Sequence, residues 1–438
     1  MKLGTGKRFT LPGRDSMLRG YGFRKELSHG VEDPIELGVL ALSEGDGKET
    51  VLLITADIAG INVSECEKIY ALLKEKYGIP AEQIWLSSSH THFAPGFEGY
   101  FINHTDGLLA YGDHPEDGEY RALWHARLLD AVDSALNSME ECILEHVEVE
   151  VPGVHFNRRT IKKSDGLIQQ SYEYPDNDDE VIFQPCDNTL TAWRFMTEKG
   201  PKAMLMAFGC HPVTGGADPY TVSGDYPWYF KAKVEELFGC PGFFMLGAAG
   251  DTVPRMRGPS SQRQTNKFNS RKNIGEILAL TLQQNMRLFR KDKKQCLAMK
   301  VVDVPVQLPP ELDHANAEKN FQEAHKNKDP QEAFYLASRL LARAYPATQF
   351  TMPLRFLRLG DKVLTGMPFE VLSAISLRLK EANPEAVLTS ITGGYNGYLP
   401  LACDFPREGY ECSFGATHFA PGTGDKFLEE AIAESKTI

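Results

Sequence analysis

The segment ETVLLITADIAGINVSECEKIYALLKEKYGIPAEQIWLSSS, residues 49–89, indicates the class of the fold. Residues 49–60 form a short, continuous apolar run, which is typical of a buried strand. Residues 62–78 have the apolar spacing of an amphipathic helix, with polar cap candidates at the start and a glycine at the end. A second apolar strand, 83–89, follows. A strand, a helix and a strand in this order predict a βαβ unit whose strands run parallel.

Two later segments, 190–209 and 354–367, each predict two antiparallel strands joined by a short polar turn. No internal repeat is visible. Hairpins mixed with βαβ units predict an α/β fold in which mixed β-sheets pack as a sandwich flanked by α-helices. We expect one large domain over residues 1–438. The charged segment at about 309–345 predicts a helical insertion, either a solvated hairpin or a lid over a site.

Composition excludes several classes of protein. The formal net charge of −12, with no basic cluster, argues against a nucleic-acid binder and against binding to an anionic membrane. No apolar run reaches roughly 18 residues, so we expect no transmembrane helix and no stable membrane anchoring. The N-terminus lacks the apolar core of a signal peptide, and the eight cysteines form no C-x-x-C pair. Reduced thiols and a cytoplasmic location are therefore expected.

The first candidate for chemistry is the His-Thr-His in IWLSSSHTHFAPGFEGYF, residues 84–101. Side chains two apart on a strand project from the same face, so His90 and His92 are expected to point the same way. Both imidazoles could then reach one small volume as metal ligands, or as a ligand and a general acid or base. A satisfied pair of polar residues at a strand end is the alternative interpretation.

Two more strand ends deliver similar groups. His211 follows an apolar strand in AMLMAFGCHPVTGG, and Glu370 lies where a hairpin strand precedes a helix. Glu370 is also explained as a carboxylate that complements the helix dipole. Two histidines and a glutamate from separate strand ends match a catalytic zinc site that keeps one position open for water. Zinc activates water and polarises a carbonyl, while the remaining histidine of His-Thr-His could shuttle a proton.

A series of short motifs extends over most of the chain. They are LRGYGFRKELSHGVEDPIELGVLAL (18–42), VLLITADIAG, the His-Thr-His with APG, FNRR (156–159), CHPV (210–213), SGDY (223–226), GMPFEV (366–371), YNGYLP (395–400) and GYE (409–411). In this order they resemble the catalytic domain of the neutral and alkaline, non-lysosomal ceramidase family. Members of that family are zinc-dependent amidases that cleave an N-acyl bond.

The resemblance implies roles for individual residues. The zinc ligands that it implies are His90, His211, Glu370 and Tyr398. It further implies that His92 is the catalytic histidine and that Arg158 and Asp225 line the site. Asp57, at a strand end, is a candidate for orienting a histidine ligand.

The chain departs from the family pattern in three places. Where the family has Gly-Asp-Val-Ser-Pro, this chain has GDTVPR (250–255), with Val253 at the serine position. Thr252 is one residue away, and such an offset usually turns a side chain away from a site. The export signal of the family is absent, and we expect no C-terminal β-sandwich domain. These differences favour activated water over a serine nucleophile, and a substrate other than ceramide.

We therefore expect a zinc-dependent hydrolase that cleaves a C–N amide (N-acyl) bond, or an ester or lactone, in a small to medium molecule. One alternative is a zinc-retaining binding protein of the same fold that has no catalytic activity. Another is a (β/α)₈ metal-dependent amidohydrolase, which the predicted hairpins disfavour. The aromatic residues after His-Thr-His, Phe93, Phe97, Tyr100 and Phe101, predict either an acyl pocket or packing under the loop.

Overall fold

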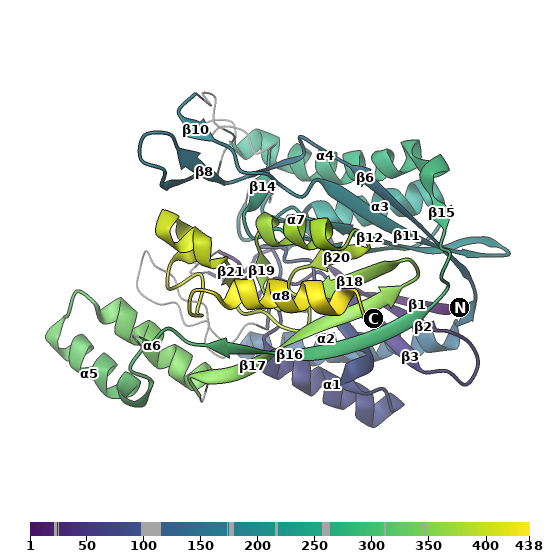
Figure 1. The fold of residues 1–438 in the computed structure, drawn as a ribbon. Helices are drawn as coiled ribbons and strands as arrows, with labels where there is room; N and C mark the ends of the chain where they lie inside the picture. The colour runs from purple at the N-terminus through teal and green to yellow at the C-terminus, as the bar shows by residue number, and fades with distance from the viewer. Residues whose placement is uncertain are drawn as a thin grey trace.

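The computed structural model describes residues 1–21, 24, 26–97, 115–172, 174, 179–214, 218–255, 263–310, 312–345 and 347–438. Within these ranges, three large mixed β-sheets are covered on their outer faces by helices (Figure 1). The predicted α/β fold with mixed sheets flanked by helices is confirmed. No helix in the described parts of the chain is both long and apolar enough to cross a membrane.

The first sheet contains the predicted βαβ unit. Its strands, in spatial order, are β4 (Ile84–Ser88), β3 (Thr50–Ala56), β2 (Glu36–Ser43), β1 (Lys2–Phe9) and β5 (Glu140–Glu141). Helix α1 (Val63–Tyr77) connects β3 to β4, and these two strands pair in parallel as predicted. The Asn62 side chain caps α1 by accepting from the Glu65 amide, and Gly78 ends the helix with a φ of 72°. Helix α2 (Pro115–Asn137) packs on β1 and β2.

The second and third sheets contain the two predicted hairpins. The second consists of β13 (Gly242–Leu246), β12 (Gly200–Phe208), β11 (Thr189–Thr197), β6 (Ile143–Glu150) and β15 (Arg290–Lys291). It is accompanied by α3 (Asp225–Phe238) and α4 (Arg263–Gln284). The third consists of β16 (Leu297–Gln307), β17 (Gln349–Leu359), β18 (Lys362–Gly366) and β20 (Ala386–Thr389). It is accompanied by α7 (Ser373–Ala382) and α8 (Thr423–Ser435).

The three sheets repeat one order of elements that the sequence does not reveal. In each, three strands that neighbour one another in the sheet pair antiparallel, a helix crosses over, a fourth strand pairs parallel to the third, and a second helix follows. Other elements are inserted between the first two of these strands in the second and third sheets. The parallel pairs are β3–β4, β12–β13 and β18–β20. Sites in α/β proteins form at the carboxyl ends of parallel strands. Each of the three sheets has one such strand pair, so the fold has three places where site residues are expected.

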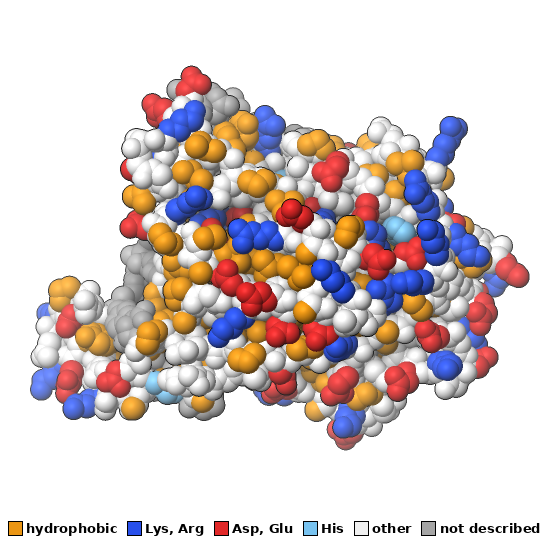
Figure 2. Space-filling model, viewed as in Figure 1, with side chains coloured by type: hydrophobic (Ala, Val, Ile, Leu, Met, Phe, Trp, Pro, Cys, Tyr) orange, Lys and Arg blue, Asp and Glu red, His pale blue; other side chains and the backbone are white. Residues whose placement is uncertain are grey.

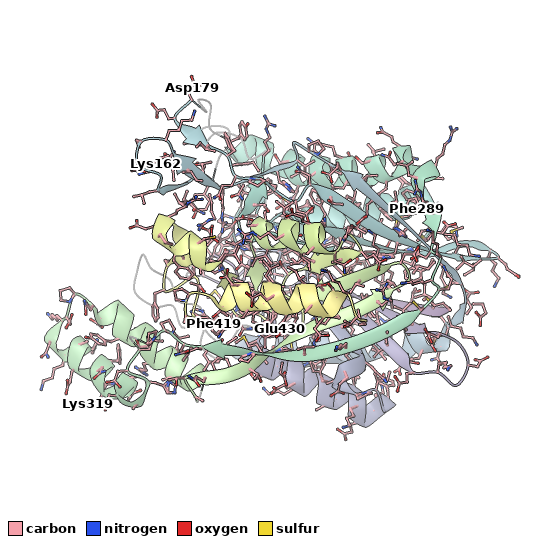
Figure 3. All side chains as sticks on the ribbon, viewed as in Figure 1. Lys162, Asp179, Phe289, Lys319, Phe419 and Glu430 are labelled. Carbon is pink, nitrogen blue, oxygen red and sulfur yellow. The ribbon has the colours of Figure 1, made fainter. Side chains whose placement is uncertain are left out.

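Smaller elements complete the description. Short strands are β7 (His155–Asn157), β8 (Arg159–Lys162), β9 (Ile168–Gln170), β10 (Val181–Ile182), β14 (Thr252–Pro254), β19 (Glu370–Val371) and β21 (Tyr398–Leu399). Short 3₁₀ helices are Ala81–Gln83, Met286–Leu288, His314–Asn316, Ala402–Arg407 and Tyr410–Cys412. Helices α5 (Ala317–Asn327) and α6 (Glu332–Ala344) form a hairpin that projects from the body between β16 and β17 (Figure 1), with Lys319 at its outer side (Figure 3).

One apolar cluster joins all three sheets. It includes Trp85 from the first sheet, Trp193 and Leu205 from the second, and Leu357 and Leu364 from the third, all fully buried. Each of three further clusters lies between one sheet and its own helices. We call the shared cluster the central core. Outside it, acidic and basic side chains are interspersed over most of the face in Figure 2.

Candidate metal centre

His90 lies in an unusual backbone conformation directly after β4. The strand ends at Ser88, and His90 has a φ of 63°, which is uncommon for any residue other than glycine. Its amide donates to the Ile58 carbonyl at 3.1 Å, and this bond helps to hold the turn. The expectation that a continuing strand places His90 and His92 on one face is therefore wrong. The left-handed turn at His90 brings the two rings together instead.

Three histidines and one glutamate converge on a single buried point. Nε2 of His92 lies 3.2 Å from Nε2 of His90 and 3.0 Å from Nε2 of His211. The Oε2 atom of Glu370 lies 3.4 Å from His90 Nε2 and 3.5 Å from His211 Nε2. All four side chains are buried, and they come from the carboxyl ends of strands in all three sheets.

Main-chain carbonyls orient two of the histidines. The Nδ1 atom of His90 lies 2.5 Å from the Ala59 carbonyl, and that of His211 lies 3.0 Å from the Ala249 carbonyl. Since a carbonyl oxygen only accepts, each Nδ1 carries the hydrogen and each Nε2 presents its lone pair to the centre, as in metal-bound histidine. Asp57, expected to orient a histidine, pairs with Lys231 at 2.7 Å instead.

A small parallel sheet places Glu370 beside Tyr398. Strands β19 and β21 pair with Glu370 directly opposite Tyr398, although 27 residues separate them in the chain. Tyr395 donates its hydroxyl hydrogen to Glu370 Oε1 at 2.8 Å. Among the described residues, no hydrogen bond reaches Glu370 Oε2, the oxygen that faces the histidines. Both candidate oxygen ligands are thus fixed by the same two short strands.

Arg158 connects Tyr398 to a buried ionic network. It donates to the Tyr398 hydroxyl at 3.0 Å, to the Gly250 carbonyl at 2.9 Å and to Glu411 at 2.8 Å. Glu411 is fully buried and also accepts from Arg159 at 2.9 Å. The sequence presented Glu411 only as part of the GYE motif, because nothing local marks its two arginine partners.

Burial and charge set the ionisation of these groups. Burial lowers the pKa of His211 to about 3, and it lowers the pKa of His92 well below the usual value for histidine. Burial alone raises the pKa of Glu370, but the adjacent His90 and His211 hold it at about 2. The pKa directions therefore favour neutral imidazoles at His92 and His211 beside an ionised Glu370 carboxylate, and these are groups that bind a metal ion.

This donor set fits a divalent metal ion. His90 and His211 both accept at Nε2, so His92 alone among the three imidazoles could donate a hydrogen there. One donor cannot satisfy two imidazole lone pairs and the unmet Glu370 oxygen at the same point. A cation removes this repulsion, and a nitrogen and oxygen set of this kind is one that zinc accepts.

The centre lies at the base of a cavity of about 380 Å³. The described residues that line it are Gly20, Tyr21, His90, His92, Arg158, Tyr172, Val213, Val253, Glu370, Tyr395, Tyr398 and Tyr410. Val253 faces the cavity, whereas the Thr252 hydroxyl is directed to the Gly209 carbonyl at 3.3 Å. Helices α5 and α6 contribute no described residue to this lining.

Asp225 lies outside the described lining. It is fully buried at the start of α3, with a φ of 52°, and its Oδ1 atom accepts from the Thr214 hydroxyl and from the Tyr226 amide. Thr214 is three residues beyond His211, so Asp225 holds the loop that carries this histidine. The structure thus places Asp225 behind the centre.

The aromatic residues after His-Thr-His do not form the wall of the cavity in the described part of the chain. Phe97 packs against Tyr120 and Trp124 in the interior, and Phe93 packs against Tyr21. Tyr100 and Phe101 lie outside the described residues. The cavity is lined instead by tyrosines from segments far apart in the chain, Tyr21, Tyr172, Tyr395, Tyr398 and Tyr410.

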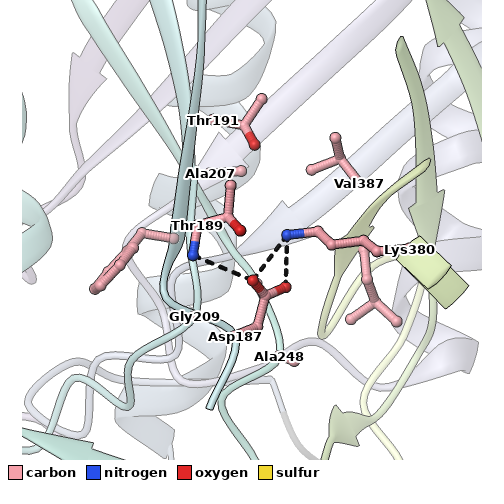
Figure 4. A pocket seen from close by; sticks show the side chains of 11 residues that line it. Asp187, Thr189, Thr191, Ala207, Gly209, Ala248, Lys380 and Val387 are labelled. Carbon is pink, nitrogen blue, oxygen red and sulfur yellow. Dashed lines mark hydrogen bonds and ion pairs between the residues drawn. The ribbon is translucent and has the colours of Figure 1, made fainter. Parts of the chain in front are cut away.

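Two other clusters of polar side chains have hydrogen-bond or ion-pair partners within the protein. Behind the His211 loop, Asp187 pairs with Lys380 and accepts from the Thr189 amide beside a cavity of about 10 Å³, room for about one water molecule (Figure 4). A cluster of His146, Asp292 and Asp361 lies outside the described cavity lining. Asp292 accepts from His146 and from the Asp361 amide, so this cluster is explained by hydrogen bonds alone.

No family model matches the sequence. A neutral ceramidase from Pseudomonas aeruginosa has a similar structure, with a TM-score of 0.71 at 16% sequence identity over 100% of this chain and 75% of that chain. A ceramidase complexed with C2 gives the same TM-score and identity over 98% and 74% of the two chains. The chain has the neutral ceramidase fold. The resemblance that the motifs indicated is therefore confirmed for the fold.

Proposed function

We propose that this chain, with its ceramidase fold, is a zinc-dependent hydrolase of an N-acyl amide bond in a small to medium molecule. An ester or a lactone is the alternative bond. The observation that carries the proposal is the convergence of His90, His211 and Glu370, lone pairs inward, on one buried point at the base of a cavity.

Four residues would hold the metal: His90, His211, Glu370 and Tyr398. Burial and the adjacent Glu370 raise the pKa of Tyr398 well above its usual value, and Arg158 opposes this because a cation that donates to a phenol oxygen favours its ionised form. Zinc bound there supplies a Lewis acid that polarises a carbonyl group and makes water nucleophilic near neutral pH.

His92 would move the proton that hydrolysis requires. Water adds to the carbonyl carbon, the C–N bond breaks, and one proton passes from the water to the departing nitrogen. His92 lines the cavity beside the centre, and its imidazole is the general acid and base that we assign to this transfer. Arg158 acts here by holding Tyr398, and Asp225 by holding the His211 loop.

Metal content is the first test. Elemental analysis of the purified protein should find one zinc per chain, and His211→Ala should lose it. His325→Ala is the matched control, because that histidine is largely exposed on α5 and should leave the zinc in place. A wild-type protein that binds no zinc even when zinc is supplied would contradict the proposal. If zinc is present, hydrolysis of a panel of N-acyl amides tests the reaction itself.

The valine at position 253, where the ceramidase family has a serine, favours a second candidate function, that of a zinc-retaining binding protein without catalytic activity. At that point the cavity wall is an apolar side chain, with Val213 beside it in the same cluster. The two functions differ at His92. In a hydrolase, His92→Ala abolishes turnover and retains zinc, whereas a binding protein shows no turnover even with His92 present.

A further inference from the structure

His92 is held in place differently from the other two histidines. The Nδ1 atoms of His90 and His211 each face a main-chain carbonyl, but His92 Nδ1 has no hydrogen-bond partner among the described residues. Its Nε2 nevertheless lies within 3.2 Å of both other Nε2 atoms. Unlike the other two rings, His92 therefore has no main-chain carbonyl among the described residues that fixes its position through Nδ1.

A short segment near the N-terminus contacts the His92 ring directly. We call Arg19, Gly20, Tyr21 and Arg24 the N-terminal strap. A Cβ atom built on Gly20 would lie 2.4 Å from Cγ of His92, so the glycine backbone rests against the imidazole. The Tyr21 ring meets the same imidazole edge-on, with centroids 4.7 Å apart. Arg24 donates to the His92 carbonyl at 2.6 Å.

The strap is itself anchored to both histidine loops. The Arg19 amide donates to the Ala94 carbonyl at 2.9 Å, two residues after His92. The Tyr21 hydroxyl donates to the Val213 carbonyl at 3.2 Å, two residues after His211. Arg24, 1% exposed, lies over the Tyr21 ring at 4.8 Å and donates to the Arg19 carbonyl. The N-terminal strap is thus hydrogen-bonded both to the loop that carries His92 and to the loop that carries His211.

We propose that the N-terminal strap positions His92 relative to His90 and His211, with Gly20 as the critical residue. Packing on two sides fixes where the ring lies and which way Nε2 points. It does so without a hydrogen bond to Nδ1 from any described residue, and that nitrogen is itself buried. The contacts alone support the claim that the strap positions His92. The claim that this position affects turnover rests on the proposed hydrolase function.

A double-mutant cycle tests the contact with no ligand. Gly20 has a φ of 94°, so Gly20→Ala strains the backbone in any background, but the collision with the ring requires His92. We expect the Tm to fall at least twice as far in the wild type as in His92→Ala. Gly166→Ala is the control, with a φ of 74° and nothing within 4 Å, and its Tm shift should be equal in both backgrounds.

The Co²⁺ spectrum tests the position of the ring. With Co²⁺ alone as the probe, Gly20→Ala should bind one ion per chain but change the visible absorption, because the displaced ring borders the metal ligands. Gly166→Ala should match the wild type. If Gly20→Ala does not fold, Tyr21→Leu replaces it, with Tyr21→Phe retaining the ring and the wild-type spectrum. Equal Tm shifts in both backgrounds, or an unchanged spectrum, would overturn the proposal.

Turnover separates this inference from the proposed function. If an amide substrate is found, Gly20→Ala should lower kcat by about 100-fold with little change in KM, as expected for a misplaced catalytic group. Absence of any hydrolysis by the wild type would contradict the hydrolase proposal and leave the Tm and Co²⁺ results standing. Full hydrolysis by Gly20→Ala would contradict the role of the strap alone.

Discussion

The hydrogen on Nδ1 determines what His90 and His211 can do. Each gives that hydrogen to a backbone carbonyl, and each is thereby left with a single lone pair directed at the centre. A side-chain acceptor could have served the same purpose, but a carbonyl in a packed loop cannot rotate away or change its charge. The ligand geometry therefore depends on the backbone of the loops at Ala59 and Ala249.

Two tyrosines of one motif should affect the metal to different degrees. Tyr395→Phe keeps the ring and removes the hydrogen bond to Glu370 Oε1, and we expect zinc affinity to fall by about 10- to 100-fold. Tyr398→Phe removes a proposed ligand and the acceptor for Arg158, so its affinity should fall further. Competition with a chelator measures both. A Tyr398→Phe protein with wild-type affinity would remove Tyr398 from the ligand set.

His155 should make the protein sensitive to acid. Its ring is buried and stacks on Phe208, and burial lowers its pKa to about 4. The unfolded chain therefore takes up a proton near pH 6.5 that the folded protein refuses until about pH 4, so stability falls as the pH falls through this window. This contribution is about 3 kcal/mol. In denaturant titrations, His155→Phe should lose less stability than the wild type between pH 7 and pH 4.5.

At the level of elements, the carboxylate that binds the N-terminus of α7 belongs to Asp251, a residue that follows a strand of the second sheet. Glu370 had two interpretations, a metal ligand or an acid at the start of this helix. In the structure, Asp251 from the second unit accepts from the Ser373 amide at 2.9 Å and from its hydroxyl at 2.7 Å. The helix terminus is satisfied by Asp251, and Glu370 is left to face the histidines.

Removing Asp251 should loosen the join between the second and third units. Asp251→Ala leaves the Ser373 amide, the Ser373 hydroxyl and the Asn157 amide group buried without their acceptor. We expect the free energy of unfolding to fall by about 3 kcal/mol in denaturant titrations. Asp303→Ala, at an exposed position of β16, should change it by less than about 0.5 kcal/mol. Equal effects would show that the cap contributes nothing.

Local patterns in the sequence predicted local structure well. The helix over 62–78 and the hairpins over 190–209 and 354–367 are confirmed because their signals lie within the elements themselves. The left-handed turn at His90 was missed, since nothing in the residue type requires it. The pairing of Glu370 with Tyr398 joins two-residue strands far apart in the chain, and no periodicity reports such a contact. Only the family resemblance suggested this tyrosine.

For the whole molecule, the central core should make unfolding cooperative. Trp85 and Trp193 belong to different sheets yet share this cluster, so neither sheet can separate without exposing large apolar side chains. We expect one transition in denaturant, with tryptophan fluorescence and far-ultraviolet circular dichroism coinciding. Leu364→Ala should shift that transition by about 2–5 kcal/mol without splitting it. Separate transitions would show that the three units fold independently.

The division of the centre among three repeated units has a consequence for synthesis. His90 emerges first from the ribosome and His211 second, while Glu370 and Tyr398 belong to the third unit. Chains fold from the N-terminus as they appear, so a growing chain holds at most the two histidines of the proposed ligand set. Strong metal capture at the proposed site would then require the third unit. Products truncated before Glu370 would not compete for the ion.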